Sequence, residues 1–100
     1  MIVSGGENVF PREVEDLLAG HDGVDEVAVI GVEDADFGQR LRAFVVAARD
    51  GEAPSEDDLK AYVRANLARY KAPREIVFLE ELPRNATGKV RKDVLRRRLG

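Results

Sequence analysis

The pattern of apolar and polar residues along the chain predicts three strands. Residues 24–32 (VDEVAVIGV) and 41–48 (LRAFVVAA) are rich in β-branched and other apolar side chains, and residues 75–80 (EIVFLE) form a shorter run of the same kind. Apolar runs of this length are typical of strands that are buried on both faces. Residues 1–3 are also apolar and strand-like, and the glycine turn SGGEN follows them at once.

Three other segments have the apolar spacing of helices. The first spans residues 11–18, with Pro11 at a favourable first position and Gly20 as its stop. The second begins at Ser55, where the acids that follow resemble a capping box, and the helix cannot continue past Pro73. The third lies within residues 90–99. The apolar positions are Val14, Leu17 and Leu18 in the first, Leu59, Val63 and Leu67 in the second, and Val94, Leu95 and Leu99 in the third.

Together these elements predict one α+β domain, in which helices flank a small sheet of about three strands. The chain contains no internal repeat and no linker, and its 100 residues suffice for a single hydrophobic core. The sequence begins abruptly on apolar residues, which indicates a piece of a longer protein.

Composition narrows the class of protein. Hydrophobic residues make up 44% of the chain and charged residues 35%, as in soluble globular domains. No apolar run approaches the roughly 20 residues of a transmembrane helix, and no secretory leader is visible at the N-terminus. The chain has no cysteine, which excludes disulfides and thiolate metal or redox sites. We therefore expect a cytoplasmic protein without a membrane span.

Charge is distributed unevenly along the chain. Residues 82–100 contain seven of the sixteen Lys and Arg and one acid, a net charge of +6, whereas residues 1–81 carry a net charge of -9. A basic tail on an acidic body argues against nucleic-acid binding by the whole domain. The basic residues within 91–98 most simply form the solvated side of a terminal helix.

Motifs considered one at a time leave several functions open. Residues 5–8 (GGEN) fit either an anion-binding nest of backbone N–H groups or a tight turn, and the spacing favours the turn. Gly88 and Lys89 resemble a Walker phosphate loop, but Val90 replaces its Ser or Thr and the first glycine is missing, so that site is excluded. The one histidine, His21, lies beside a helix-ending glycine and is expected at the surface. No catalytic triad or metal cluster can be assembled.

The flexible stretch LPRNATGKVRK, residues 82–92, raises a separate question. Its glycine and small polar residues favour a mobile loop with Lys89 at the tip. Such a lysine can be idle surface charge, a nucleic-acid contact, a phosphate clamp or a catalytic cation, and the residues themselves leave these alternatives open.

Three segments in order resemble one family over essentially the whole chain. They are MIVSGGENVFPREVE, VAVIGVEDADFGQRLRAFVV and LARYKAPREIVFLEELPRNATGKVRKDVL. The chain resembles the C-terminal domain of adenylate-forming enzymes, in particular acyl- and aryl-CoA synthetases. In that family a large N-terminal AMP-binding domain holds most of the ATP and carboxylate sites, and the small domain swings over it in two orientations. We expect residues 1–100 to be this small domain, with the large domain and a hinge aspartate preceding Met1.

The resemblance assigns a role to Lys89. The lysine of the family's PxNxxGK-type loop matches this position, and in the first half-reaction it reaches the carboxylate and the nucleotide near the α-phosphate. The resemblance implies ATP, Mg²⁺ and CoA as the cofactors of the full-length enzyme, with none expected to bind this domain alone and no metal ligand within it. Lys89 is also expected to be a target of a lysine acetyltransferase, as the matching lysine is in some relatives.

For the second half-reaction the resemblance places other residues beside CoA and the acyl-adenylate. Gly5, Gly6 and Glu7 would lie along the pantetheine channel, and Phe37 would lie near the CoA adenine. Tyr70, Lys71 and Arg74 would meet the CoA phosphates. A buried Phe37 or an idle Arg74 is an almost equally good interpretation.

The expected function is therefore that of the mobile C-terminal domain of an ATP-dependent acyl-CoA ligase, inactive when isolated. Two alternatives stay open: a luciferase-like or peptide-synthetase relative, and a stand-alone binding module that uses the basic terminal helix. The acyl substrate and the oligomeric state cannot be read from this sequence, because the substrate pocket is expected in the large domain.

Overall fold

A computed structural model describes residues 2–4, 7–36, 38–49, 51, 53–68 and 71–98. The elements follow one another as β1 (Ile2–Ser4), β2 (Glu7–Val9), α1 (Pro11–Ala19), β3 (Val24–Asp34), β4 (Gly38–Ala47), α2 (Glu56–Asn66), β5 (Glu75–Phe78) and α3 (Lys92–Arg98). The three strands predicted from the apolar runs correspond to β3, β4 and β5, and the three predicted helices correspond to α1, α2 and α3.

Strand β4 is the centre of a mixed sheet. It pairs antiparallel with β3 from Val24↔Ala47 to Asp34↔Gly38, and parallel with β5 from Arg42↔Glu75 to Val45↔Phe78. The short antiparallel hairpin of β1 and β2 joins the sheet where Ser4 of β1 pairs with Gly38 of β4. Because β3 occupies one edge of β4, β1 and β5 share the other edge. The three-stranded α+β core is confirmed, and the hairpin extends it by short strands.

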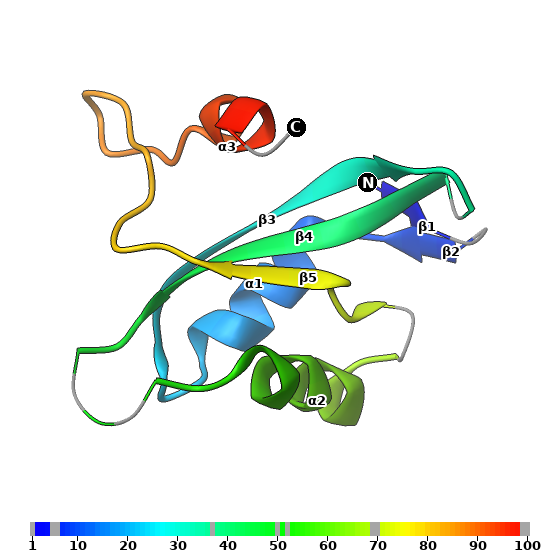
Figure 1. The fold of residues 1–100 in the computed structure, drawn as a ribbon, viewed down its shortest axis with the longest axis horizontal. Coiled ribbons are helices and arrows are strands. Elements are labelled where there is room, and N and C mark those ends of the chain that lie inside the picture. The colour runs from blue at the N-terminus through cyan, green and yellow to red at the C-terminus, as the bar shows by residue number, and fades with distance from the viewer. Residues whose placement is uncertain are drawn as a thin grey trace.

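Helices cover both faces of the sheet, as Figure 1 shows, with α1 and α2 on one side and α3 on the other. Alternation along the strands supplies an apolar layer to each face. The layer under α1 and α2 contains Val9, Val14, Leu18, Val24, Val29, Leu41, Ala43, Val45, Leu59, Val63 and Ile76. The layer under α3 contains Ala28, Ile30, Phe44, Val46, Leu82 and Leu95. The C-terminal segment is thus packed onto the sheet by its own apolar residues.

The predicted start of α2 is confirmed in detail. The Ser55 hydroxyl oxygen accepts the Asp58 N–H at 3.0 Å, and the Asp58 carboxylate accepts the Ser55 N–H at 3.2 Å. This reciprocal capping box satisfies two N–H groups that the first turn of a helix leaves without partners. Asp58 itself is the acid of the box.

The last helix is shorter than the apolar spacing predicted. It spans Lys92–Arg98 rather than beginning at residue 90, because Val90 forms an isolated antiparallel bridge with Arg84. Residues 90 and 91 therefore belong to the loop that carries Lys89, and the helix begins only after that loop has closed. Leu99 lies outside the described residues.

A cluster of charges joins the strands near the β1–β2 hairpin. The Glu75 carboxylate accepts hydrogen bonds from Arg40 Nε at 2.6 Å and from Arg42 Nη2 at 3.0 Å, and Arg40 Nη1 also donates to the Glu33 carbonyl at 2.6 Å. Burial alone would raise the pKa of Glu75, but the hydrogen bonds from the two arginines hold that pKa below its ordinary value. The cluster therefore ties β5 to β4 with charges that stay paired at neutral pH.

Candidate functional site

Lys89 lies near the tip of a closed loop formed by residues 83–91. The two arms of the loop are joined by hydrogen bonds from the Asn85 N–H to the Lys89 carbonyl at 2.9 Å and from the Arg91 N–H to the Pro83 carbonyl at 2.8 Å. These bonds and the bridge between Arg84 and Val90 give the segment the form of a small hairpin. The loop predicted around Lys89 is confirmed, and its mobility stays a prediction.

The side chain of Asn85 organises the tip of this hairpin. Its Oδ1 atom accepts three hydrogen bonds, from the Thr87 N–H at 3.0 Å, from the Thr87 hydroxyl at 2.7 Å and from the Lys89 N–H at 3.0 Å. Gly88 follows with φ of +85°, a conformation that side chains rarely adopt. The motif residues Asn85 and Gly88 therefore set the backbone from which the lysine side chain projects.

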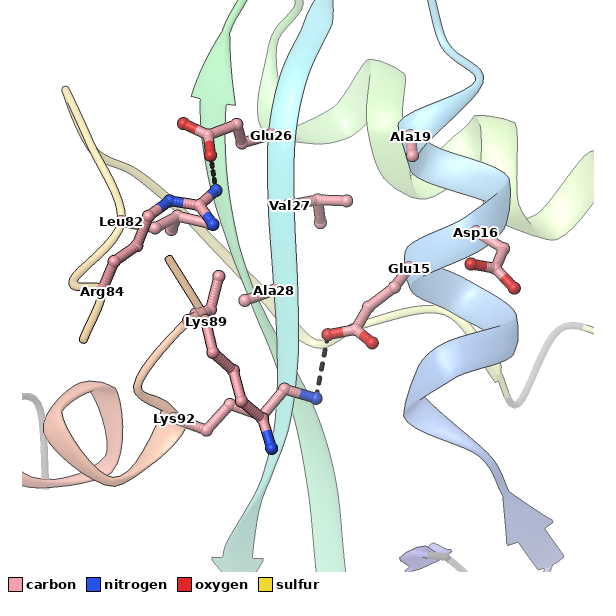
Figure 2. A pocket seen from close by; sticks show the side chains of 11 residues that line it. Glu15, Asp16, Ala19, Glu26, Val27, Ala28, Leu82, Arg84, Lys89 and Lys92 are labelled. Atoms are coloured by element: carbon pink, nitrogen blue, oxygen red, sulfur yellow. Dashed lines mark ion pairs between the residues drawn. The ribbon is translucent and has the colours of Figure 1, made fainter. Parts of the chain in front are cut away.

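The Lys89 side chain is exposed, and within the described part of the chain no carboxylate forms an ion pair with its ammonium group. Two neighbouring cations differ from it, since Arg84 pairs with Glu26 of β3 and Lys92 pairs with Glu15 of α1 at 2.9 Å. Figure 2 shows both pairs, with Lys89 between them. The loop thus presents one lysine whose charge is available to an anion.

A groove of about 540 Å³ runs between α1, β3 and the loop. Its charged lining is divided by sign, with acidic side chains on α1 and β3 and basic side chains on the C-terminal segment (Figure 2). The described residues contain no group of three or more His, Asp or Glu that would hold a metal ion.

A second group of charges lies at the start of α3. Asp93 accepts hydrogen bonds from Arg91 Nη2 at 2.6 Å and from Arg97 Nη2 at 2.9 Å. These contacts, that from Arg91 foremost, lower the pKa of Asp93 to about 2. The basic face of α3 is therefore partly neutralised by its one acid.

The residues expected along CoA are described only in part. Gly5, Gly6, Phe37 and Tyr70 lie outside the described residues. Glu7 is described by its backbone alone, which begins β2 opposite Ser4. The structure consequently leaves the CoA assignments of these five residues as predictions.

The two remaining CoA candidates, Lys71 and Arg74, lie just before β5. The Lys71 ammonium forms an ion pair with Glu13 of α1 at 2.8 Å, and only 19% of its side chain is exposed. Arg74 is exposed, and its N–H donates to the Leu41 carbonyl at 3.0 Å. A phosphate at Lys71 would have to compete with Glu13.

The sequence pattern missed the residues that support the Lys89 loop. Glu15 lies in the amphipathic pattern of α1 and Glu26 within an apolar strand, and neither position carries a local signal of its partner. Arg84 is one of the seven basic residues of 82–100, and nothing near it in the sequence indicates its partner. Ion pairs between elements far apart in the sequence appear only once the sheet and α1 have brought those elements together.

Comparison with known proteins identifies the family. The family described as AMP-binding enzyme C-terminal domain matches residues 13–89. The long-chain-fatty-acid–CoA ligase FadD13 of Mycobacterium tuberculosis is 50% identical over 96 residues, which cover 96% of this chain and 19% of that ligase. Feruloyl-CoA synthase of an Amycolatopsis species is 47% identical over 100 residues, covering 100% of this chain and 20% of that enzyme.

Solved structures agree with the sequence relatives. A fatty acyl CoA synthetase of Mycobacterium tuberculosis superposes with a TM-score of 0.89 at 48% identity, over 98% of this chain and 19% of that one. The amide bond synthetase McbA from Marinactinospora thermotolerans gives a TM-score of 0.91 at 38% identity, over 96% of this chain and 19% of that one. The chain thus spans about a fifth of the length of these relatives. The family match over residues 13–89, the identity to these relatives and the superposed fold show that the chain belongs to the family of AMP-binding enzyme C-terminal domains.

Proposed function

We propose that this chain is the mobile C-terminal domain of an ATP-dependent acyl-CoA ligase and that Lys89 serves its first half-reaction. The observation that carries the proposal is the exposed Lys89 ammonium, held on an internally hydrogen-bonded loop and left without an ion pair in the described part of the chain. The sequence relatives named above are CoA ligases, which supports CoA as the final acceptor.

In the first half-reaction a carboxylate oxygen attacks the α-phosphorus of ATP, and pyrophosphate leaves to give an acyl-adenylate. Negative charge grows on the oxygens of the α-phosphate and the leaving group. A fixed cation at that position stabilises the transition state more than the ground state. Lysine fits this task because it is a compact charge on a long, flexible stem.

In the second half-reaction the thiol sulfur of CoA attacks the acyl carbonyl carbon, its proton is lost and AMP leaves. We propose that Gly5 and Gly6 leave room for the thiol arm, with Glu7 beside it. Phe37 is assigned to the adenine and Tyr70, Lys71 and Arg74 to the phosphates of CoA. A CoA phosphate would have to compete with Glu13 for Lys71.

The proposed partners follow from the two half-reactions. They are an N-terminal AMP-binding domain of the same polypeptide, CoA and the acyl-adenylate, with Mg²⁺ accompanying ATP. A lysine acetyltransferase that acts on Lys89 is a further proposed partner. Two of the relatives are named for different acids, one being a long-chain fatty acid ligase and the other a feruloyl-CoA synthase. We therefore assign the choice of acid to the large domain. None of the described helices could span a membrane. The cytoplasmic location expected from the sequence is a separate part of the proposal.

The test is a pair of single-turnover assays on the full-length protein that carries this chain. Lys89→Ala should slow formation of the acyl-adenylate by about 10²–10³-fold, the cost of losing one electrostatic stabiliser. The same variant, given pre-made acyl-adenylate, should form thioester at nearly the parental rate. Lys60→Ala, which removes a lysine from α2 on the other face of the sheet, is the matched control and should leave both steps unchanged.

A bulky replacement of Gly6 should produce the opposite division. It should obstruct thioester formation and leave adenylation largely intact, because the thiol channel is used only in the second step. Equal slowing of both half-reactions by Lys89→Ala would contradict the proposal and make the lysine a structural residue.

A further inference from the structure

We propose that Arg84 and Glu26 are positioning residues that hold the Lys89 loop against β3 for adenylation. The inference rests on the proposed role of Lys89. It adds two residues on which the rate of that step should depend, although neither is required to touch the substrate.

Arg84 connects the sheet to the peptide group next to Lys89. One terminal nitrogen of its guanidinium, Nη2, pairs with the Glu26 carboxylate, and the other, Nη1, donates to the Gly88 carbonyl at 2.6 Å. Figure 2 shows Arg84 reaching across to Glu26 beside Lys89. A guanidinium has several N–H groups in a rigid fork, so it can bond a carboxylate and a carbonyl together. The Gly88 carbonyl belongs to the peptide unit that leads directly into Lys89.

The base of the loop is held in place independently of this bridge. On the outgoing arm Leu82 is buried in the apolar layer, and on the returning side Leu95 of α3 is fully buried in the same layer. Lys92 pairs with Glu15, whose carboxylate also accepts the Val29 N–H of β3 at 2.8 Å. Arg84 adds a direct contact between β3 and the tip of the loop, beside the hydrogen bonds that Asn85 makes within the hairpin.

Glu26 is suited to anchor the bridge because it lies within the antiparallel ladder of β3 and β4, opposite Val46. A carboxylate on a paired strand has a fixed origin, whereas one on a loop would move with its partner. Arg84 and Glu26 are 41% and 30% exposed, and ion pairs with this exposure contribute little to folding stability. We therefore infer that the main effect of the pair is on where the Lys89 ammonium lies.

The expected size of the effect follows from positioning alone. A displacement of about 1 Å in a reacting or stabilising group can cost up to about 10²-fold in rate. Arg84→Lys keeps a positive charge but cannot make both contacts, and it should slow adenylation by roughly 10- to 100-fold. Glu26→Gln keeps the shape of the side chain but loses its charge, and it should slow adenylation by a smaller factor, about 3- to 10-fold.

The experiment is a double-mutant cycle in the full-length protein, with both half-reactions measured under single-turnover conditions and the melting temperature of each variant recorded. Arg84→Lys and Glu26→Gln should each slow adenylation, leave thioester formation from pre-made acyl-adenylate unchanged and leave the melting temperature nearly unchanged. In a Lys89→Ala background the same changes should have no further effect, because the group they position is gone.

Arg40→Lys is the matched control. Arg40 bonds a carboxylate and a backbone carbonyl in the same way, but on β4 it lies six residues before Val46, the partner of Glu26, which is about 20 Å at the usual rise of a strand. This variant should leave adenylation unchanged. A loss of adenylation rate equal to that of Arg84→Lys would overturn the inference. Replacing any arginine that bonds both a carboxylate and a carbonyl would then have the same effect, wherever it lies.

Three further results would overturn the inference and separate its failure from that of the proposed function. Full adenylation activity in both variants, with Lys89→Ala impaired, would remove the positioning role and leave the role of Lys89 intact. An equal loss by Arg84→Lys with and without Lys89 would mean that Arg84 acts on the nucleotide directly. An unimpaired Lys89→Ala would instead contradict the proposed function itself.

Discussion

Replacing the buried leucine of α3 tests how much the packing of that helix, which follows the Lys89 loop, contributes to the stability of the domain. Leu95 is fully buried in the apolar layer with Phe44, Ile30 and Leu82. The helix has seven residues, too few to be stable in water without tertiary contacts. Leu95→Ala should therefore loosen the helix and remove the support at the returning end of the loop.

The magnitude can be worked from the side chain that is lost. Leu95→Ala removes three carbon atoms, which at about 0.8 kcal/mol each is about 2.4 kcal/mol of transfer free energy. The cavity left behind adds to this, and buried Leu→Ala changes typically cost about 2–5 kcal/mol in total. We expect Leu95→Ala to lower the free energy of unfolding by about 3 kcal/mol. A domain of this size has a free energy of unfolding of roughly 5–15 kcal/mol, so the loss would be a substantial part of it.

The assay is equilibrium urea unfolding of the 100-residue chain. With a denaturant slope of about 1–3 kcal/mol per molar, the midpoint should fall by roughly 1–3 M. Val94→Ala is the matched control, since this neighbour on the same helix is only half-buried and should cost about 1 kcal/mol or less. A loss below about 1 kcal/mol for Leu95→Ala would refute the reasoning, because the helix would then not depend on this contact.

Four other predictions concern single residues or the isolated chain. Ser55→Ala removes one half of the capping box of α2 and should lower the free energy of unfolding by about 1 kcal/mol, measured by urea unfolding. The Asp93 pKa is held at about 2 mainly by the hydrogen bond from Arg91, so Arg91→Gln should raise it toward 3.8 in an NMR titration. Because that pKa is depressed, the stability it contributes should be complete above about pH 4 and lost as the pH falls toward 2. An acetyltransferase should modify Lys89, which mass spectrometry would detect, and acetylation should abolish the charge used in adenylation. The purified chain should release no pyrophosphate from ATP with any carboxylic acid, and acid-dependent release would contradict this.

The main elements of the fold could be predicted because their signals are local and repeated. Strands β3 and β4 are long apolar runs, and the start of α2 is marked by Ser55 and the acids that follow it. The short strand β2 escaped prediction, since three residues next to a glycine turn contain too little periodicity. The start of α3 was misplaced because Val90 has an apolar side chain that suits either a helix or the bridge it forms with Arg84.

The candidate site also has residues that could be predicted from the sequence and residues that could not. Lys89 could be selected from the sequence because its loop residues, Asn85 and Gly88 among them, are contiguous and belong to a motif. Arg84 and Glu26 could not be paired, because their contact exists only after β3 has formed and the C-terminal segment has packed across it. A contact of this kind depends on topology, which the residues near either partner do not encode.

One sheet carries both halves of the proposed site, and this bears on how they can alternate. The hairpin of β1 and β2, whose residues 5 and 6 are proposed to line the thiol channel, joins β4 at Gly38. The Lys89 loop is tied through Arg84 to Glu26, which pairs with Val46 near the other end of β4. Eight residues of strand separate these two points, about 26 Å at the usual rise per residue. A nine-residue loop with both arms anchored cannot cover that distance by local motion. If both groups act at one active site, we expect the domain to turn as a rigid body between the half-reactions, because the β4 ladder holds the two groups apart.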